Sequence, residues 1–300
     1  MRVVSLLPAG TEMVAALGAL EHLVGVTHEC DHPPVVCSRA RVTRSAVAVG
    51  AAPGAVNAQV AALSSSGAPL FTLDERLITA LHPDLVLTQA LCDVCAVSED
   101  DVRALAARLT PPPRVLALSA TSFDGVMADL RAVAEALDLA DEGAELLQGL
   151  AARVRHVHET LKAARAPRPR VAVIEWTEPV FPAGHWTPEM VRRAGGVDVV
   201  MQPGAHSVAT EMTRIVAADP EIVLVAPCGY DVARAEAEAR ALLDDARWSW
   251  LAGRQLWAVD ANGLVSRPGP RLVDGIETFA RIFNPALFSP IDRERARRVA

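Results

Sequence analysis

The chain has 300 residues, of which 51% are hydrophobic and 22% are charged, so it is long and apolar enough for two domain cores and is not a disordered protein. Its 29 basic and 36 acidic residues give a net charge of −7, and the basic residues are scattered, which argues against nucleic acid or an anionic membrane surface as a partner. No apolar run reaches the ~20 residues that a membrane-spanning helix needs, so we expect no membrane insertion.

The first residues carry none of the marks of a secretory signal. Met1-Arg2 leads directly into the strand-like run 3–7, without a basic region, a long apolar region or a small-residue cleavage site. We therefore expect a cytoplasmic location. The five cysteines are odd in number and would be mostly reduced there, which makes a disulfide framework a poor interpretation.

Strand-like and helical patterns alternate in residues 1–120, which predicts an N-terminal α/β lobe with a largely parallel sheet. The strand-like runs are 3–7, 23–27, 70–73, 84–88 and 115–118, and the helical patterns are 11–17, 53–69, 74–81 and 98–109. Thr11, Asp74 and Ser98 are expected to cap the helices that begin at them.

Residues 121–167 lack strand signals and predict a helical connector. Apolar residues recur at helical spacing over 122–137 and over 141–165, so each helix has one face to bury. At 1.5 Å per residue, the second helix would be about 40 Å long, enough to lie across two lobes.

Residues 168–288 repeat the alternation and predict a C-terminal α/β lobe. Asp219-Pro-Glu-Ile-Val-Leu224 echoes His82-Pro-Asp-Leu-Val-Leu87, and each motif leads into a loop with cysteine. Residues 289–300 are rich in arginine and are expected to form a charged surface tail.

Several short motifs, taken in order, resemble the vitamin B12-binding members of the helical-backbone substrate-binding proteins, a family that also includes iron-siderophore-binding proteins. These motifs are Val4-Ser-Leu-Leu-Pro-Ala-Gly-Thr-Glu12, Leu23-Val-Gly-Val-Thr27 followed by Asp31-His-Pro-Pro34, Pro83-Asp-Leu-Val-Leu87, Gly184-His-Trp186 with Ala194-Gly-Gly196, and Arg267-Pro-Gly-Pro-Arg271. The resemblance covers roughly residues 2–285. It implies an α/β fold with two Rossmann-like lobes, mostly parallel sheets and a long rigid backbone helix that joins them, with the ligand in the inter-lobe cleft.

The resemblance also implies the ligand, cobalamin or another corrinoid, and the residues that contact it. From the first lobe these are Pro8, Thr11, His28, Glu29, His32 and Gln89, and from the second lobe they are Trp176, Phe181, His185, Trp186, His206, Tyr230 and Arg267. A corrin is large, flat and mostly apolar, so the aromatic faces of Trp176, Phe181 and Trp186 suit it. His185 is a candidate axial ligand to the metal, or it hydrogen-bonds a neighbour. Arg267 either contacts the ligand or forms a cap and a salt bridge.

Soft metal ligands gather in two loops that follow strand-like runs. His28-Glu29-Cys30 follows one run and Cys92-x-x-Cys95 follows another, and the carboxyl ends of neighbouring parallel strands converge. We therefore expect Cys92, Cys95, Cys30 and His28 to bind a zinc, cobalt or iron ion. Structural buried thiols are an equally common explanation of the CxxC pair, and a thioredoxin-like redox pair is a further alternative.

The predicted function is non-enzymatic binding of a corrinoid or a related metal chelate, as a carrier, scavenger or sensor. No nucleophile-elbow, phosphate-loop or zinc-protease motif is present to suggest an enzyme. One alternative is the substrate-binding component of a cobalamin or iron-siderophore ABC importer, and another is a cysteine-dependent metal-binding or redox protein on the same fold. In importing relatives a glutamate on each lobe docks onto the ABC permease, but the matching positions here hold Arg76 and Thr213, which argues against docking.

Overall fold

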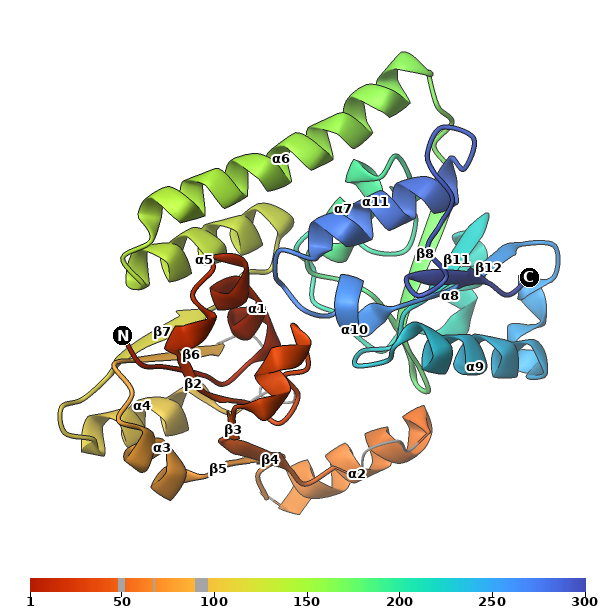
Figure 1. The fold of residues 1–300 in the computed structure, drawn as a ribbon. Helices are drawn as coiled ribbons and strands as arrows, with labels where there is room; N and C mark the ends of the chain where they lie inside the picture. Colours follow the sequence, from red (N-terminus) through yellow and green to blue (C-terminus); the bar gives the residue numbers. More distant parts are fainter. Residues whose placement is uncertain (48–51, 67, 90–96) are drawn as a thin grey trace. The chain divides into compact units, whose positions relative to one another are not determined.

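The computed structural model describes residues 1–47, 52–66, 68–89 and 97–300 (Figure 1). The chain divides into two compact units. Unit 1 comprises Met1–Ala120 and Asp124–Gln148, and unit 2 comprises Thr121–Phe123 and Gly149–Ala300. Helix α6 (Ala140–Ala163) continues without interruption from unit 1 into unit 2. The predicted inter-lobe helix is therefore present.

Unit 1 is built on a parallel sheet with the strand order β3-β2-β1-β6-β7. Its strands are β1 (Val3–Ser5), β2 (Leu23–Val26), β3 (Ala40–Arg41), β6 (Leu85–Gln89) and β7 (Arg114–Leu118). The central strands β1 and β6 are mostly apolar because both faces of the sheet are covered, and Val3, Val4 and Leu87 are fully buried. The predicted parallel sheet is confirmed.

A two-stranded antiparallel sheet was not foreseen. Strand β5 (Phe71–Leu73) pairs with β4 (Thr43–Ser45), so the strand predicted at 70–73 exists but does not join the parallel sheet. The polar pattern Thr43-Arg-Ser45 gave no apolar run from which β4 could be predicted.

The helices of unit 1 begin largely where their capping residues predict. They are α1 (Pro8–Ala16), α2 (Pro53–Ser66), α3 (Glu75–Leu81), α4 (Glu99–Arg108) and α5 (Phe123–Ala136), the last starting at the unit boundary. Asp74 accepts a hydrogen bond from the Leu77 amide at 3.0 Å, and Ser98 accepts one from the Asp101 amide at 3.2 Å, so both caps are confirmed. The Thr11 cap was wrong: Pro8, whose fixed φ suits a first helical turn, starts α1 and leaves Thr11 buried inside it.

Unit 2 contains a six-stranded mixed sheet with the order β10-β8-β11-β12-β13, and β9 pairs with β8. The strands are β8 (Arg170–Thr177), β9 (Val180–Pro182), β10 (Val197–Asp198), β11 (Ile222–Val225), β12 (Gln255–Val259) and β13 (Ala296–Arg298), and the helices are α7 (Thr187–Arg193), α8 (Met212–Ala217), α9 (Val232–Leu243), α10 (Ala261–Leu264) and α11 (Leu272–Phe283). Strands β8, β10, β11 and β12 are parallel, while β9 and β13 run antiparallel to their neighbours.

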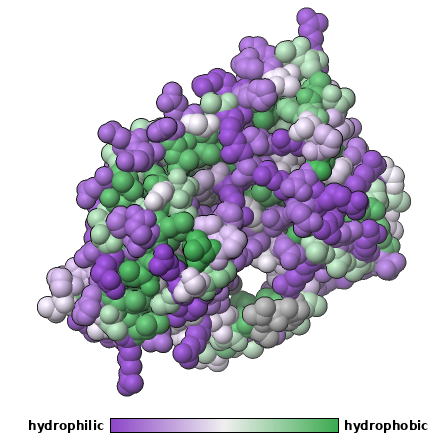
Figure 2. Space-filling view, in the orientation of Figure 1, coloured by the Kyte–Doolittle hydropathy of each residue, from purple (hydrophilic) through white to green (hydrophobic). Residues whose placement is uncertain are grey.

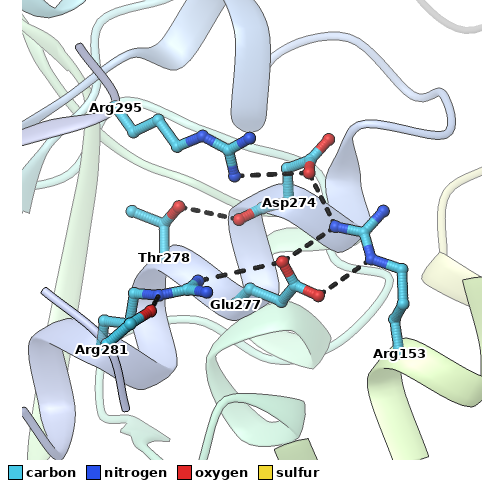
Figure 3. Close-up of polar contacts among 7 residues, drawn as sticks. Arg153, Asp274, Glu277, Thr278, Arg281 and Arg295 are labelled. Atoms are coloured by element: carbon cyan, nitrogen blue, oxygen red, sulfur yellow. Dashed lines mark hydrogen bonds and ion pairs between the residues drawn. The ribbon is translucent and has the colours of Figure 1, made fainter. Parts of the chain in front are cut away.

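Arginine-carboxylate contacts within unit 2 join the second half of α6 to α11 (Figure 3). Arg153 donates to both oxygens of Glu277 at 2.9 Å and to Asp274 at 2.7 Å. The hydrogen bonds that Arg153 donates to Glu277 raise the pKa of Arg153 above its usual value. The Arg153 side chain is 39% exposed, so water screens its attraction to the two carboxylates. These contacts therefore fix the position of α6 on α11 more than they add to the free energy of unfolding.

Surface character is mixed, as in most folded domains, since a chain has too little polar surface to cover itself. Figure 2 shows green hydrophobic atoms among purple hydrophilic ones on the face in view. Among the residues that the structure describes, no helix combines the length and the apolar character needed to cross a bilayer.

Candidate functional site

The parallel pairing of unit 1 brings three of its predicted site loops to one edge of the sheet. Strand β1 lies between β2 and β6, so the segments after these strands start at the same, C-terminal edge. The segments after β1 and β2 carry Pro8 and Thr11, and His28 to His32. Gln89 is the last residue of β6. Thr11 Oγ1 lies 3.1 Å from Cys30 Sγ, and both residues are buried. Glu29 and His32 are exposed at the same edge.

His28 is held by the two-stranded β4–β5 sheet rather than by other predicted site residues. Its Nδ1 lies 2.7 Å from Thr43 Oγ1, and its ring centroid lies 5.7 Å from that of Phe71. Burial, and then the positive charge of Arg41, lower the pKa of His28, so the imidazole is neutral at neutral pH. No local sequence signal marked Thr43, Phe71 or Arg41, because all three reach His28 from β3, β4 or β5.

The predicted metal cluster remains a prediction. Cys92 and Cys95 fall in residues 90–96, which lie outside the described part of the chain. Within the described residues, no group of three or more His, Cys, Asp or Glu side chains is placed to hold a metal ion. Of the two other expected ligands, Cys30 contacts Thr11 and His28 uses Nδ1 on Thr43, which leaves the His28 Nε2 atom for other contacts.

An aromatic group lies at the corresponding edge of the sheet in unit 2. Trp176 and Phe181 are cross-strand partners on β8 and β9, and both are half-buried. The Trp176 ring meets the buried Tyr230 ring edge-on at 6.0 Å, and the Arg234 guanidinium lies 3.7 Å from the centroid of Tyr230. The predicted loop at Trp176 is therefore a hairpin, whose pairing fixes the direction of the two rings. Arg234 was not predicted.

Two predicted histidines lie together on neighbouring loops of unit 2. His185 Nε2 and His206 Nδ1 are 3.2 Å apart, and the ring planes are nearly perpendicular at 84°. The His185 amide donates to the Ala205 carbonyl at 2.7 Å, and the Gly204 amide donates to the His185 carbonyl at 2.9 Å, so the backbone holds the loops in register. Burial, and then the neighbouring His206, lower the pKa of His185.

Backbone geometry explains why this histidine pair needs its glycine. A Cβ at Gly184 would overlap the Ala205 carbonyl oxygen, so only glycine lets the two loops approach. His185 itself has φ of 53°, a left-handed conformation that non-glycine residues adopt rarely and often at functional positions.

Trp186 and Arg267 are placed differently from the expectation that they line a ligand surface. Trp186 is only 6% exposed, and its indole nitrogen donates to the Val265 carbonyl at 2.7 Å. Arg267 is 8% exposed and lies near the carboxylate of Asp260. Both side chains are largely buried in unit 2, and their contact with a ligand stays a prediction.

The family model described as "Periplasmic binding protein" matches residues 3–251 of this chain. The chain belongs to the periplasmic binding protein family. Its members bind ligands and do not catalyse reactions, so this periplasmic binding protein is a substrate-binding protein and not an enzyme. No curated protein sequence matches the chain significantly.

Solved structures with the same fold cover nearly the whole chain. A periplasmic heme-binding protein from Pseudomonas aeruginosa is 21% identical with a TM-score of 0.73, and the match covers 100% of this chain and 98% of that one. The periplasmic heme-binding protein BhuT, solved with two hemes, is 24% identical with a TM-score of 0.68 over 96% and 99% of the chains. The vitamin B12-binding protein BtuF of Vibrio cholerae is 20% identical with a TM-score of 0.65 over 95% and 98%.

These matches confirm the predicted family and its two-lobed α/β fold, and they correct the predicted location. The cytoplasmic expectation was wrong, because the matched structures are periplasmic proteins. That expectation rested only on the residues around Met1, a much weaker observation than similarity along the whole chain.

Proposed function

We propose that this protein binds a metal-centred macrocycle, either a corrinoid such as cobalamin or a heme. The observations that carry the proposal are the His185–His206 pair and the Trp176–Phe181 hairpin, which comes just before His185 in the chain. A neutral imidazole has a lone pair for a metal, and half-buried aromatic faces suit a flat apolar ring. The ligands in the descriptions of the matched structures, heme and vitamin B12, belong to this chemical class.

Chemically, the pair would work by exchange of partners. In the free protein one ring N–H donates to the other ring nitrogen across 3.2 Å, and on binding one imidazole would give its lone pair to the metal instead. The lowered pKa of His185 favours this role because less proton competition has to be overcome at neutral pH. Trp186 and Tyr230, which are buried, would support the contact surface from behind.

Titration with hemin and with aquocobalamin, followed by absorption spectroscopy, tests the proposal. We expect His185→Ala or His206→Ala to weaken binding by about tenfold or more, the loss of about 1.4 kcal/mol, and to change the spectrum of the bound metal. His158→Ala, the same substitution at an exposed position of α6, is the control and should change neither. If neither macrocycle binds below the high micromolar range, the proposal fails.

The pH dependence of that titration has a defined sign. Because the pKa of His185 lies below 6.5, coordination should persist as the pH falls through the usual histidine range and weaken only at lower pH, where the imidazole takes up a proton. Affinity that already falls above pH 7 would point to a different metal ligand.

A second candidate concerns what happens to the bound ligand: delivery to an ABC importer, the role that family membership favours. The surface at the expected docking positions differs, since Arg76 and Thr213 are exposed there and Glu75 pairs with Arg108 at 2.8 Å. Restored macrocycle uptake in cells that lack their own binding protein would support importer function. Binding without any uptake, also after Arg76→Glu with Thr213→Glu, would leave carriage or storage as the role.

A further inference from the structure

A cavity of about 420 Å³ lies in unit 2, where the segment after α11 folds back against the edge of the sheet. Four arginines line it: Arg281 of α11, and Arg293, Arg297 and Arg298 of the C-terminal segment. The lining also includes Trp257 and Ser289 but no aspartate or glutamate. This volume falls in the range of small-molecule sites, and no part of the lining belongs to the histidine and aromatic group described above.

The pairing of β13 with β12 builds one wall of this cavity. Trp257 and Arg298 are directly opposite each other in the antiparallel register, so their side chains share one face of the sheet. Arg297 is the next residue along and alternates to the other face, where it pairs with Glu236 at 3.0 Å. The guanidinium of Arg297 is thus already neutralised, whereas Arg298 has Trp257 beside it.

Three of the cavity arginines lack an aspartate or glutamate side chain that they do not share with another arginine. Arg281 approaches Glu277 at 3.8 Å, and Arg153 donates to both oxygens of the same carboxylate at 2.9 Å. Figure 3 draws both arginines on this carboxylate. Within the described residues, Arg293 has no ion pair, and Arg298 donates to a main-chain oxygen of the last residue, Ala300, at 3.1 Å and contacts no aspartate or glutamate. The result is a local excess of positive charge on a chain whose net charge is −7.

We propose that this cavity binds a small organic anion, whose phosphate or carboxylate groups are held by Arg281, Arg293 and Arg298 and whose flat apolar part packs on Trp257. The planar guanidinium fork donates two parallel hydrogen bonds to such groups, which a lysine cannot do. The Ser289 hydroxyl, 3.4 Å from the Nε of Arg281, adds a further donor at the same end. Clustered like charges repel one another, and a bound anion removes that repulsion.

Calorimetric titration of the full chain with tripolyphosphate, citrate and ATP tests the proposal. Tripolyphosphate tests recognition of phosphate groups, and citrate tests recognition of carboxylate groups. ATP carries a triphosphate together with a flat ring. We expect binding by at least one probe, weakened about tenfold or more in Arg293→Gln with Arg298→Gln. The control removes two exposed helical arginines elsewhere, Arg131→Gln with Arg155→Gln, and should keep the affinity.

A second variant tests the apolar wall. ATP should bind more tightly than tripolyphosphate, and Trp257→Leu should remove that advantage while tripolyphosphate affinity stays. Absence of binding by all three probes at low salt, or an equal loss in the control pair, would overturn the proposal. Hemin and cobalamin titrations of the same variants should be unchanged, so failure here is distinct from failure of the macrocycle proposal.

Discussion

At the scale of single residues, Asp198 is a buried carboxyl whose charge the fold does not fully compensate. It is the last residue of β10, and its Oδ1 accepts hydrogen bonds from the amides of Val200 at 2.9 Å and Met201 at 2.8 Å. Its Oδ2 is buried without a hydrogen-bond partner among the described residues. Burial raises the pKa of Asp198 from 3.8 to about 6, against the effect of the two amides.

This raised pKa predicts a pH-dependent loss of stability. Between pH 3.8 and about 6 the folded state binds the proton more tightly than the unfolded state, so stability falls as the pH rises through this window. Asp198→Asn keeps the Oδ1 acceptor and cannot ionise. We therefore expect the variant to gain stability relative to the parent by up to about 3 kcal/mol between pH 4 and pH 7, measured by urea unfolding.

Asp245→Asn is the control for that experiment. Hydrogen bonds from Arg247 lower the pKa of Asp245, so from about pH 5 upward this group is ionised in both the folded and the unfolded state, and its replacement should change the unfolding free energy by the same amount from there to pH 7. If the difference in unfolding free energy between Asp198→Asn and the parent also stayed constant with pH, Asp198 would be charged in both the folded and the unfolded state.

Capping residues were predictable from the sequence, whereas side-chain burial was not. Asp74 and Ser98 act on amides three residues ahead, so the local sequence contains both partners. The family resemblance implied that Trp186 contacts the ligand, but its indole reaches Val265, 79 residues away. Only the packing of the whole unit decides such a contact.

At the scale of elements, helix α6 contains two glycines with opposite roles. Gly143 is buried, and a Cβ there would overlap the Cβ of Ala134, so the glycine allows close packing of α5 and α6 within unit 1 (Figure 1). Gly149 is exposed, and an added Cβ would meet nothing within 4 Å. No packing contact explains Gly149, the first residue of α6 in unit 2.

The same substitution should therefore have opposite effects at these two positions. Gly149→Ala should stabilise the protein by about 0.5–1 kcal/mol, because alanine is the better helix former and no atom obstructs it. Gly143→Ala should destabilise it by about 1–3 kcal/mol through overpacking. Urea midpoints of the two variants and the parent measure both effects, and equal shifts would contradict the packing argument.

Elements with strong apolar periodicity were predicted well, and edge strands were not. The interval 141–165 predicted α6, and 84–88 predicted β6, each to within two residues at either end. Strands β9 and β13 were missed because one contains proline and the other is rich in arginine, features of loops and tails. Each is an edge element, where a strand needs only one partner and can keep polar residues.

At the scale of the whole molecule, the sequence predicted which ends of the strands carry the site but not which side chains meet there. The parallel topology of each unit places the predicted loops at a C-terminal edge, which follows from strand order alone. The pairs Thr11 with Cys30 and His185 with His206 join segments about 20 residues apart, and nothing in either segment specifies the other.

The continuity of α6 leads to the last prediction, that ligand binding changes the overall dimensions little. The helix runs for 24 residues through the boundary between the units, with Gly143 packed in unit 1 and Arg153 bound to α11 in unit 2. Bending it sharply would break main-chain hydrogen bonds, so large hinge rotations are disfavoured. Small-angle scattering with and without the macrocycle should give radii of gyration within about 1 Å. A variant with three glycines at exposed positions of α6 should have a looser helix and a larger change in radius of gyration on ligand binding. Its substitutions are Gln148→Gly, Ala151→Gly and Ala152→Gly. A change of several ångströms in the parent protein would show that α6 does not restrain the two units.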